Sequence, residues 1–318
     1  MIQGTINPIC IGVKSNTGGK WIILRETQCY TQSMVKMKYV IGIDAGGTKI
    51  RGVLMSGKTI LKRSEIFYNT THITKQLFLK SLFAAIDQLT IKDVSRIGIG
   101  LPGTITNNRV VGAGNVKILS HIDVKKLVEK KYKTRVLLDN DVKVALRADA
   151  SNHKQYNSLF MLTLGTGIGG AWWLNGKIMR GQFGTAYEAG HIIMDKTPKH
   201  LYELEDFCGR KFFLRKGYDP LVSETKARAG NAMHKKLWHE FGTNLGIILA
   251  NIANLIEPDA IVIGGGISHA WPLYIKTARK TMRRLILSKT ARSHVRIVKT
   301  KSHKWIGAVG AAMMAQGK

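Results

Sequence analysis

The sequence predicts an α/β protein built from two similar halves, and three observations support this prediction. First, from Lys38 onward short apolar strands alternate with helical patterns, which is typical of α/β domains with a mixed sheet. Second, residues 39–61 and residues 158–179 share one order: an apolar strand, a glycine turn, a second strand, a tight turn and a third strand. Third, a length of 318 residues suits about two domains.

The first half begins with three strands in residues 38–66, KYVIGIDAGGTKIRGVLMSGKTILKRSEI, where SGK suits a hairpin connection. Apolar residues at helical spacing predict a helix within residues 71–89. A short buried strand, SRIGIGLPG, follows at residues 95–103. Residues 134–150, TRVLLDNDVKVALRADA, read as a strand that runs into a helix. This alternation predicts one complete α/β unit.

The second half begins near Asn157, and a long helix is expected from about Ala232 to Leu255. IVIGGGIS is a further strand that ends in glycines, and a last helix from about Trp305 to Met314 carries small residues that suit close packing on a sheet. We therefore expect four segments: a disordered N-terminal extension (residues 1–36), an N-terminal α/β lobe (37–152), a C-terminal α/β lobe (153–304) and a C-terminal helix that packs back on the N-terminal lobe (305–318).

The chain is strongly basic, because 49 Lys and Arg residues stand against 20 Asp and Glu residues and give a formal net charge of +29. Such a charge attracts polyanions, which include nucleic acid, anionic membranes and phosphorylated substrates. Residues 271–304 contain no acidic residue at all. Both a solvated basic helix face and a polyanion-binding surface are compatible with this segment, which shows no recognisable nucleic-acid motif.

The cysteine content and the hydropathy pattern bear on the compartment. Cys10, Cys29 and Cys208 are too few and too scattered for a disulfide framework or a four-thiolate zinc site. No segment has the length and apolarity of a membrane span, and the N-terminus lacks the pattern of a secretory signal. We therefore expect a cytoplasmic protein with no membrane partner.

Three glycine turns, AGGTK at residues 45–49, GTGIGG at 165–170 and GGGIS at 264–268, each follow an apolar strand. Glycine lets backbone amides approach an anion closely. A hairpin or a strand-to-helix turn explains each of them alone on structural grounds. Their occurrence in both halves of one chain predicts a nucleotide held between two lobes.

Asp44 lies directly beside the first of these turns, where a carboxylate would repel phosphate unless a cation sat between them. We therefore expect Asp44 to bind Mg²⁺, directly or through water. The alternative is a turn aspartate that bonds its own backbone. Thr48 and Lys49 add a hydroxyl and an ammonium group for phosphate oxygens.

Two further groups of polar residues suit the transfer of phosphate to an alcohol. Asp141 follows an apolar strand and could take the proton of a substrate hydroxyl, although Asp139, Asn140 or Asp141 could equally be the N-cap of the next helix. Glu188 and His191, three residues apart, could face a polyhydroxylated ligand together with Glu205. An exposed acid and a paired histidine explain that spacing equally well.

Taken in order, DAGGTK, LPG, GAGN, DND, GTGIGG, EAGH, LE, PDAIVIGGGIS and GAVGAA strongly resemble the ROK family of bacterial sugar kinases and sugar-responsive regulators. The resemblance covers about residues 38–318. It implies the two-lobed actin-like, hexokinase-type ATPase fold (ribonuclease H-like), in which each lobe has a mixed five-stranded sheet flanked by helices. ATP and Mg²⁺ are the cofactors that it implies.

The resemblance also assigns roles by position. The residues implied to bind the cofactor are Asp44, Gly46, Gly47, Thr48 and Lys49 in the first loop, Gly165, Thr166, Gly167 and Gly169 in the second, and Gly265 and Gly266 beside the adenosine. The residues implied to contact the sugar are Asn115, Asn140, Asp141, Glu188, His191 and Glu205. Among these, Asp141 takes the place of the catalytic base.

The chain departs from the family in two places. Most members carry a cysteine-rich zinc loop after the EAGH-type motif, but IIMDKTPKHLYEL, between His191 and Glu205, holds no cysteine, so no zinc site is expected. The regulators carry a helix-turn-helix domain ahead of the kinase-like body, and the roughly 36 residues here lack paired amphipathic helices. The resemblance therefore implies a stand-alone kinase, and a homodimer is common in the family.

The function implied is ATP-dependent phosphorylation of a hexose or N-acetylhexosamine, most often at the hydroxyl on carbon 6. One alternative is a non-catalytic protein of this type that senses sugar or binds a polyanion such as nucleic acid. Another keeps the enzyme but changes the donor to inorganic polyphosphate, for which a basic groove is well suited. The sequence does not name the sugar, because discrimination among hexoses rests on small differences in loop geometry.

Overall fold

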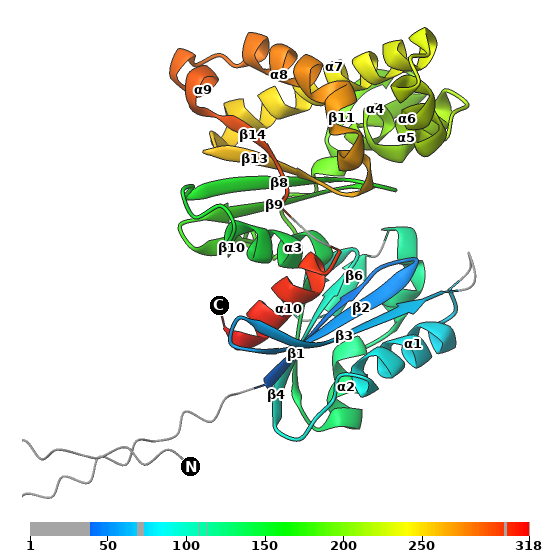
Figure 1. Cartoon of the computed structure of the whole chain (residues 1–318), viewed down its shortest axis with the longest axis vertical. Coiled ribbons are helices and arrows are strands. Elements are labelled where there is room, and N and C mark those ends of the chain that lie inside the picture. Colours follow the sequence, from blue (N-terminus) through cyan, green and yellow to red (C-terminus); the bar gives the residue numbers. More distant parts are fainter. Residues whose placement is uncertain (1–38, 69–72, 108, 113, 302–303, 318) are drawn as a thin grey trace, which may run out of the picture. The chain divides into compact units, whose positions relative to one another are not determined.

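The computed structural model describes residues 39–68, 73–107, 109–112, 114–301 and 304–317 (Figure 1). The predicted extension of residues 1–36 lies outside these described residues. Within them the chain forms two five-stranded sheets, each mixed and each flanked by helices. The predicted α/β fold class with two mixed five-stranded sheets is confirmed.

The first sheet has the strand order β3-β2-β1-β4-β7. Strands β1 to β3 form an antiparallel meander, whereas β4 and β7 run parallel to β1. Because β1, β4 and β7 are parallel, their carboxyl ends meet at one edge of the sheet, which is where α/β folds place ligands. The strands are β1 (Tyr39–Ala45), β2 (Lys49–Ser56), β3 (Thr59–Phe67), β4 (Val94–Leu101) and β7 (Arg135–Asn140).

The second sheet has the order β10-β9-β8-β13-β14 and repeats the same pattern, with an antiparallel meander followed by two parallel strands. The similarity between residues 39–61 and 158–179 therefore reflects a shared topology. The strands are β8 (Ser158–Leu164), β9 (Ile168–Leu174), β10 (Lys177–Met179), β13 (Ala260–Gly264) and β14 (Arg296–Lys299).

Two small hairpins and several helices complete the described chain. The hairpins are β5–β6 (Thr104–Thr106 and Arg109–Gly112) and β11–β12 (Ile193–Thr197 and His200–Glu203). The α-helices are α1 (Lys75–Asp87), α2 (Val124–Tyr132), α3 (Asp141–Ala150), α4 (Leu204–Phe207), α5 (Gly209–Arg215), α6 (Pro220–Arg228), α7 (Ala232–Ile256), α8 (Trp271–Leu285), α9 (Lys289–His294) and α10 (Ile306–Gln316). Short 3-10 turns are η1 (Gly114–His121), η2 (Ala189–His191) and η3 (Gly266–Ala270).

The long helix and the closing helix agree with the sequence to within two residues at each end. Residues 192–231, for which the sequence indicated no elements, hold the β11–β12 hairpin and helices α4, α5 and α6. These elements have nine residues or fewer. Two turns of helix are too short for apolar periodicity to stand out from its surroundings.

Helices α3 and α10 lie between the two sheets (Figure 1). Val142, Leu146 and Ala150 of α3 pack against the second sheet, whereas Val144 on the opposite side packs against Ala311 of α10. Gly310 of α10 approaches α3 so closely that a Cβ there would collide with the carbonyl oxygen of Val144. The small residues predicted for the closing helix therefore allow close packing.

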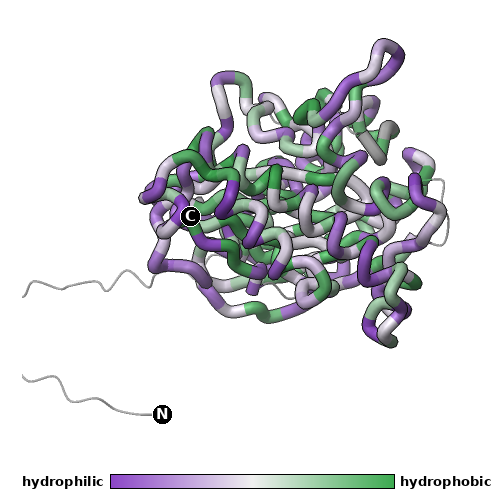
Figure 2. The backbone as a smooth tube through the Cα atoms, turned by 90° about the horizontal axis from the view of Figure 1, so that it is seen from above, coloured by the Kyte–Doolittle hydropathy of each residue, from purple (hydrophilic) through white to green (hydrophobic). Residues whose placement is uncertain are grey.

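Each sheet has its own apolar core. One cluster joins the first sheet to α1 and α2, and a larger one joins the second sheet to α7 and α8. Figure 2 shows hydrophobic segments in the interior and hydrophilic ones mostly at the periphery. No helix among the described residues is long and apolar enough to cross a membrane.

Candidate active site

Two carboxylates lie at the carboxyl ends of the parallel strands in the first sheet. Asp44 is the penultimate residue of β1, and Asp141 is the first residue of α3, directly after β7. The N-terminal end of α10 faces Asp44, since a Cβ on Gly307 would touch its carboxyl group. Both carboxylates thus lie near the N-terminal end of a helix, where the helix dipole favours negative charge.

The surroundings of these carboxylates favour the protonated form. Burial raises the pKa of Asp44 to about 6, although the positive charges of Arg51 and Lys49 oppose the shift. Burial raises the pKa of Asp141 to about 7, and repulsion from Asp44 and Glu188 adds to this effect. The three acidic groups therefore lie close enough to repel one another. A carboxylate with a pKa near neutrality suits a general base.

Asn140 fixes the start of helix α3. Its side-chain oxygen accepts from the backbone N–H groups of Val142 and Lys143 at 2.9 and 3.2 Å, which makes it the N-cap. Its side-chain amide donates to the carbonyl of Gly103 at 3.0 Å. Of the three residues in the DND motif that could have capped helix α3, Asn140 is the N-cap. The carboxylate of Asp141 is therefore not the cap of this helix.

Asp139, which precedes this cap, is fully buried and forms a bidentate ion pair with Arg180. The guanidinium nitrogens lie 2.9 and 2.5 Å from the two carboxylate oxygens. Arg180 follows β10 in the second sheet, so the pair joins the end of β7 to the segment that leads to Glu188. Such a planar, two-point contact fixes orientation as well as distance.

The segment that carries Glu188 contacts the first lobe at three further points. Lys143, a buried residue of α3, donates from Nζ to the carbonyl of Gly184 at 2.8 Å. Thr106 donates to the carbonyl of Phe183 at 3.0 Å, and Thr104 donates to the carboxylate of Glu188 at 3.4 Å. These contacts place Glu188 beside Asp141.

The first glycine turn connects β1 to β2 in a tight loop. The amide of Gly46 donates to the carbonyl of Lys49 at 3.0 Å, while Gly47 and Thr48 are exposed. The Lys49 ammonium lies 5.7 Å from the centre of the Phe67 ring. The turn therefore leaves the Thr48 hydroxyl and the Gly47 backbone open to a ligand beside Asp44.

The second glycine turn occupies the matching place between β8 and β9, and the third lies next to it. Gly165 donates to the carbonyl of Gly167 at 3.0 Å, and Thr166 is exposed. Gly265 has a φ of +82°, and a Cβ there would collide with the carbonyl of Leu164, which precedes Gly165. Gly265 and Gly266 therefore lie beside the second turn. This is expected because β8 and β13 are parallel neighbours, so the turns that follow them lie at the same edge of the sheet.

Gly169, the second residue of β9, connects the second turn to helix α3. A Cβ at this position would collide with the side chain of Val142, the residue after Asp141. The glycine predicted for phosphate binding thus also lets β9 lie directly against the start of α3.

Of the remaining predicted sugar residues, His191 and Glu205 form ion pairs with other residues. His191 is exposed, and its Nδ1 lies 3.1 Å from a carboxylate oxygen of Glu203. Glu205, in α4, pairs with Lys211. Asn115 lies in η1, and its side chain is outside the described part of the structure. Asp44, Asp141 and Glu188 are thus brought together, whereas His191 and Glu205 form separate ion pairs.

Sequence reasoning missed four residues that shape this site: Thr104, Lys143, Arg180 and Gly307. Lys143 and Arg180 each contact a residue that is 41 positions away in the chain. No local spacing marks such contacts. The presence of a lysine in the otherwise apolar start of α3 was the one available signal for Lys143.

The sequence model of the ROK family matches residues 40–212 and 215–318, so the chain belongs to the ROK family. The glucokinase of Streptomyces coelicolor is 25% identical over 320 residues, which cover 88% of this chain and 98% of that protein. The xylose repressor of Bacillus spizizenii is 26% identical over 264 residues, covering 77% and 68%.

Among solved structures, a ROK family glucokinase from Streptomyces griseus in complex with glucose and AMPPNP has a TM-score of 0.76 and 25% identity. The match covers 88% of this chain and 100% of that one. The predicted family and the predicted actin-like, hexokinase-type fold are confirmed.

Proposed function

We propose that this protein phosphorylates a hexose or an N-acetylhexosamine with ATP as the donor. The enzyme class expected from the sequence, a sugar kinase, is confirmed by the family match and by the glucokinase relatives. The observation that carries the finer proposal is the meeting of Asp44, Asp141 and Glu188 beside two matching glycine turns. The hydroxyl on carbon 6 is the proposed acceptor.

Asp141 is the proposed general base. Its pKa of about 7 leaves about half of the carboxylate ionised at neutral pH, and that form can take a proton from a sugar hydroxyl. Asn140, which precedes Asp141, and Glu188, whose charge acts on it, would bind the other hydroxyls of the ring. The buried setting strengthens such hydrogen bonds.

Asp44 fits the role of a Mg²⁺ ligand. It is a partly buried carboxylate with hard oxygen donors beside an exposed hydroxyl and open backbone, and Mg²⁺ in phosphotransferases is held by one or two carboxylates together with substrate phosphates and water. When bound, the ion would neutralise charge on the phosphates. Lys49, Thr48 and the glycine amides would orient the phosphates for in-line transfer.

The test is phosphoryl transfer by the purified protein with Mg-ATP across a panel of hexoses and N-acetylhexosamines, followed by NMR of the product to locate the phosphate. We expect sugar-dependent ADP release that is lost in Asp141→Asn and kept in Asp195→Asn. Asp195 is an exposed carboxylate that bonds its neighbour's amide much as Asp141 does. Activity retained in Asp141→Asn would refute the assignment of the base.

Two alternatives are separated by the same assay. If inorganic polyphosphate, but not ATP, supports transfer, the donor is polyphosphate. If sugar binds without turnover for either donor, the protein is a sensor. A xylose repressor among the relatives motivates this alternative.

A further inference from the structure

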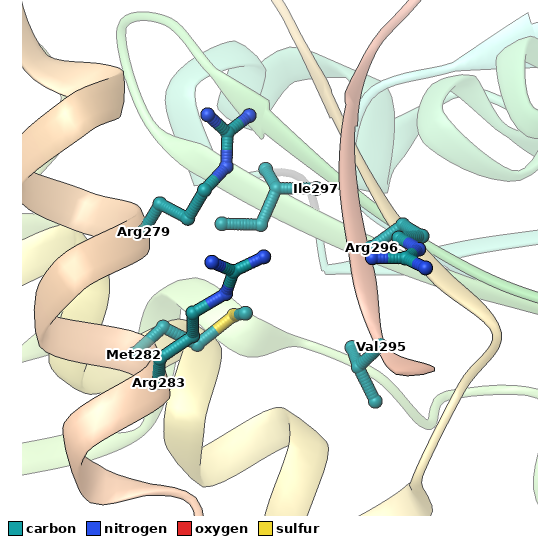
Figure 3. A pocket seen from close by; sticks show the side chains of 6 residues that line it. All are labelled: Arg279, Met282, Arg283, Val295, Arg296 and Ile297. Carbon is teal, nitrogen blue, oxygen red and sulfur yellow. The ribbon is translucent and has the colours of Figure 1, made fainter. Parts of the chain in front are cut away.

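A hollow of about 340 Å³ lies between helix α8 and strand β14. It is lined by Arg279, Met282 and Arg283 from α8 and by Val295, Arg296 and Ile297 from β14 and the residue before it. Figure 3 shows the side chains of Arg279 and Arg283 extending from the helix toward the strand, with Ile297 pointing back toward them and Arg296 on the far side of the strand. Two guanidinium groups of α8 thus face the hollow, and Arg296 lies at its edge.

These arginines have no neutralising partner among the residues that the structure describes, because none of their guanidinium groups takes part in an ion pair or a side-chain hydrogen bond there. Arg279 and Arg283 are four residues apart on one helix face, where like charges repel. Asp259, whose carbonyl accepts from the backbone of Arg296, points its carboxylate at the amides of Asn157 and Ser158 on the other side of β13.

The base of the hollow is apolar. Met282, Val295 and Ile297 are buried, with exposed fractions of 1%, 4% and 7%. Charge interactions are stronger beside such a low-dielectric surface than in open water. An anion that entered the hollow would therefore gain more from the two guanidinium groups of α8 than it would on a flat, solvated surface.

The hollow is separate from the candidate active site. It lies against the amino end of β14, whereas Gly265 and Gly266 follow the carboxyl end of the parallel neighbour β13. Helix α8 begins shortly after these glycines, and Arg283 is twelve residues further along it, which corresponds to about 18 Å at the usual rise of a helix.

We propose that this hollow binds a compact anion that carries two or more phosphate groups. Guanidinium groups match phosphate oxygens in two-point hydrogen bonds, and the two on α8 suit two phosphate groups. The volume is at the small end of the range for ligand sites and exceeds what one orthophosphate needs. No aromatic side chain lines the hollow, whereas single-stranded nucleic acid is usually bound by base stacking on aromatic residues.

The test is isothermal titration calorimetry of the full chain with tripolyphosphate at physiological salt. We expect saturable binding by the wild type and a loss of about tenfold in affinity for each arginine in the variant Arg279→Gln/Arg283→Gln. The matched control, Lys276→Gln/Lys280→Gln, removes the same charge from the same helix. It should retain the affinity to within about threefold, since its effect is limited to screened charge.

A third variant keeps the charge and changes only the geometry. Arg279→Lys/Arg283→Lys should bind more weakly than the wild type and more tightly than the glutamine variant, because lysine acts as a point charge. Circular dichroism confirms folding of each variant. Orthophosphate should bind much more weakly than tripolyphosphate.

Four outcomes would overturn the proposal. They are the absence of saturable binding, unchanged binding in the glutamine variant, an equal loss in the control variant, and binding of a single-stranded RNA oligonucleotide that tripolyphosphate does not displace. The second outcome would place the anion at the glycine turns, and the last would identify nucleic acid as the partner.

Discussion

The substitution Asp141→Asn is expected to abolish phosphoryl transfer and to stabilise the folded protein. The stabilisation is expected because the surroundings of the Asp141 carboxylate disfavour its negative charge. Its pKa rises from the ordinary value of 3.8 to about 7. Asparagine has nearly the same shape and can still accept the hydrogen bond from the amide of Val142, which is 2.9 Å long. The substitution therefore removes the charge and leaves the local contacts in place.

The magnitude follows from proton linkage. Each pKa unit corresponds to about 1.4 kcal/mol, so a rise of about three units destabilises the folded state by about 4 kcal/mol above pH 7. The sign depends on pH: the folded state binds the extra proton between about pH 4 and pH 7, so the penalty is absent below pH 4 and grows as the pH rises through this window. Loss of a favourable charge at the start of α3 subtracts about 0.5 kcal/mol.

The assay is urea unfolding of the wild type and Asp141→Asn at pH 8 and pH 5 in the presence of EDTA. We expect the variant to be more stable by about 3.5 kcal/mol at pH 8 and by about 1 kcal/mol at pH 5. The control Asp195→Asn removes an exposed carboxylate and should change stability by less than about 0.5 kcal/mol at both values. A variant that is less stable at pH 8, or a difference that does not change with pH, would refute the reasoning.

Three further predictions concern packing, ion pairing and catalysis. Gly310→Ala should destabilise the protein by about 3 kcal/mol or more in thermal unfolding, since its methyl group meets a backbone carbonyl of α3, whereas Gly112→Ala, whose methyl group would make only an ordinary contact with the Thr104 hydroxyl at 3.9 Å, should be near neutral. Arg180→Gln should destabilise by about 2–3 kcal/mol in urea, because the buried Asp139 loses both hydrogen bonds from the guanidinium group; a change below 0.5 kcal/mol would show that water replaces the arginine. If Asp141 is the base, kcat/KM should fall about tenfold per pH unit below about pH 7, and a flat profile down to pH 5 would contradict that role.

The sequence predicted the parts of this protein that depend on local pattern. The meander around Asp44 and the matching one around Gly165 were visible because strands, glycine turns and hairpins succeed each other within about twenty residues. The carboxyl ends of parallel strands then had to meet at one edge of each sheet. For this reason the order of the motifs was sufficient to predict most of the fold and half of the site.

The parts that the sequence did not reveal depend on contacts between distant segments. Gly307 reaches Asp44 across 263 positions of the chain, and Lys143 reaches Gly184 across 41. The ion pairs of His191 and Glu205 depend on the local path of residues 192–211, whose elements are too short to show a period. A motif specifies which residue types are present, whereas their partners are set by tertiary packing.

The candidate site is therefore held by neighbouring structure, since its own charges oppose folding. Asp44 and Asp141 are partly buried, repel each other and have raised pKa values, so they weaken the folded state at neutral pH. Helices α3 and α10, whose first turns face these carboxylates, are fixed by close contact at Gly310 and by apolar packing on both sheets. A substitution in that packing should consequently alter the spacing of the two carboxylates, and with it the pKa of Asp141, before it unfolds the chain.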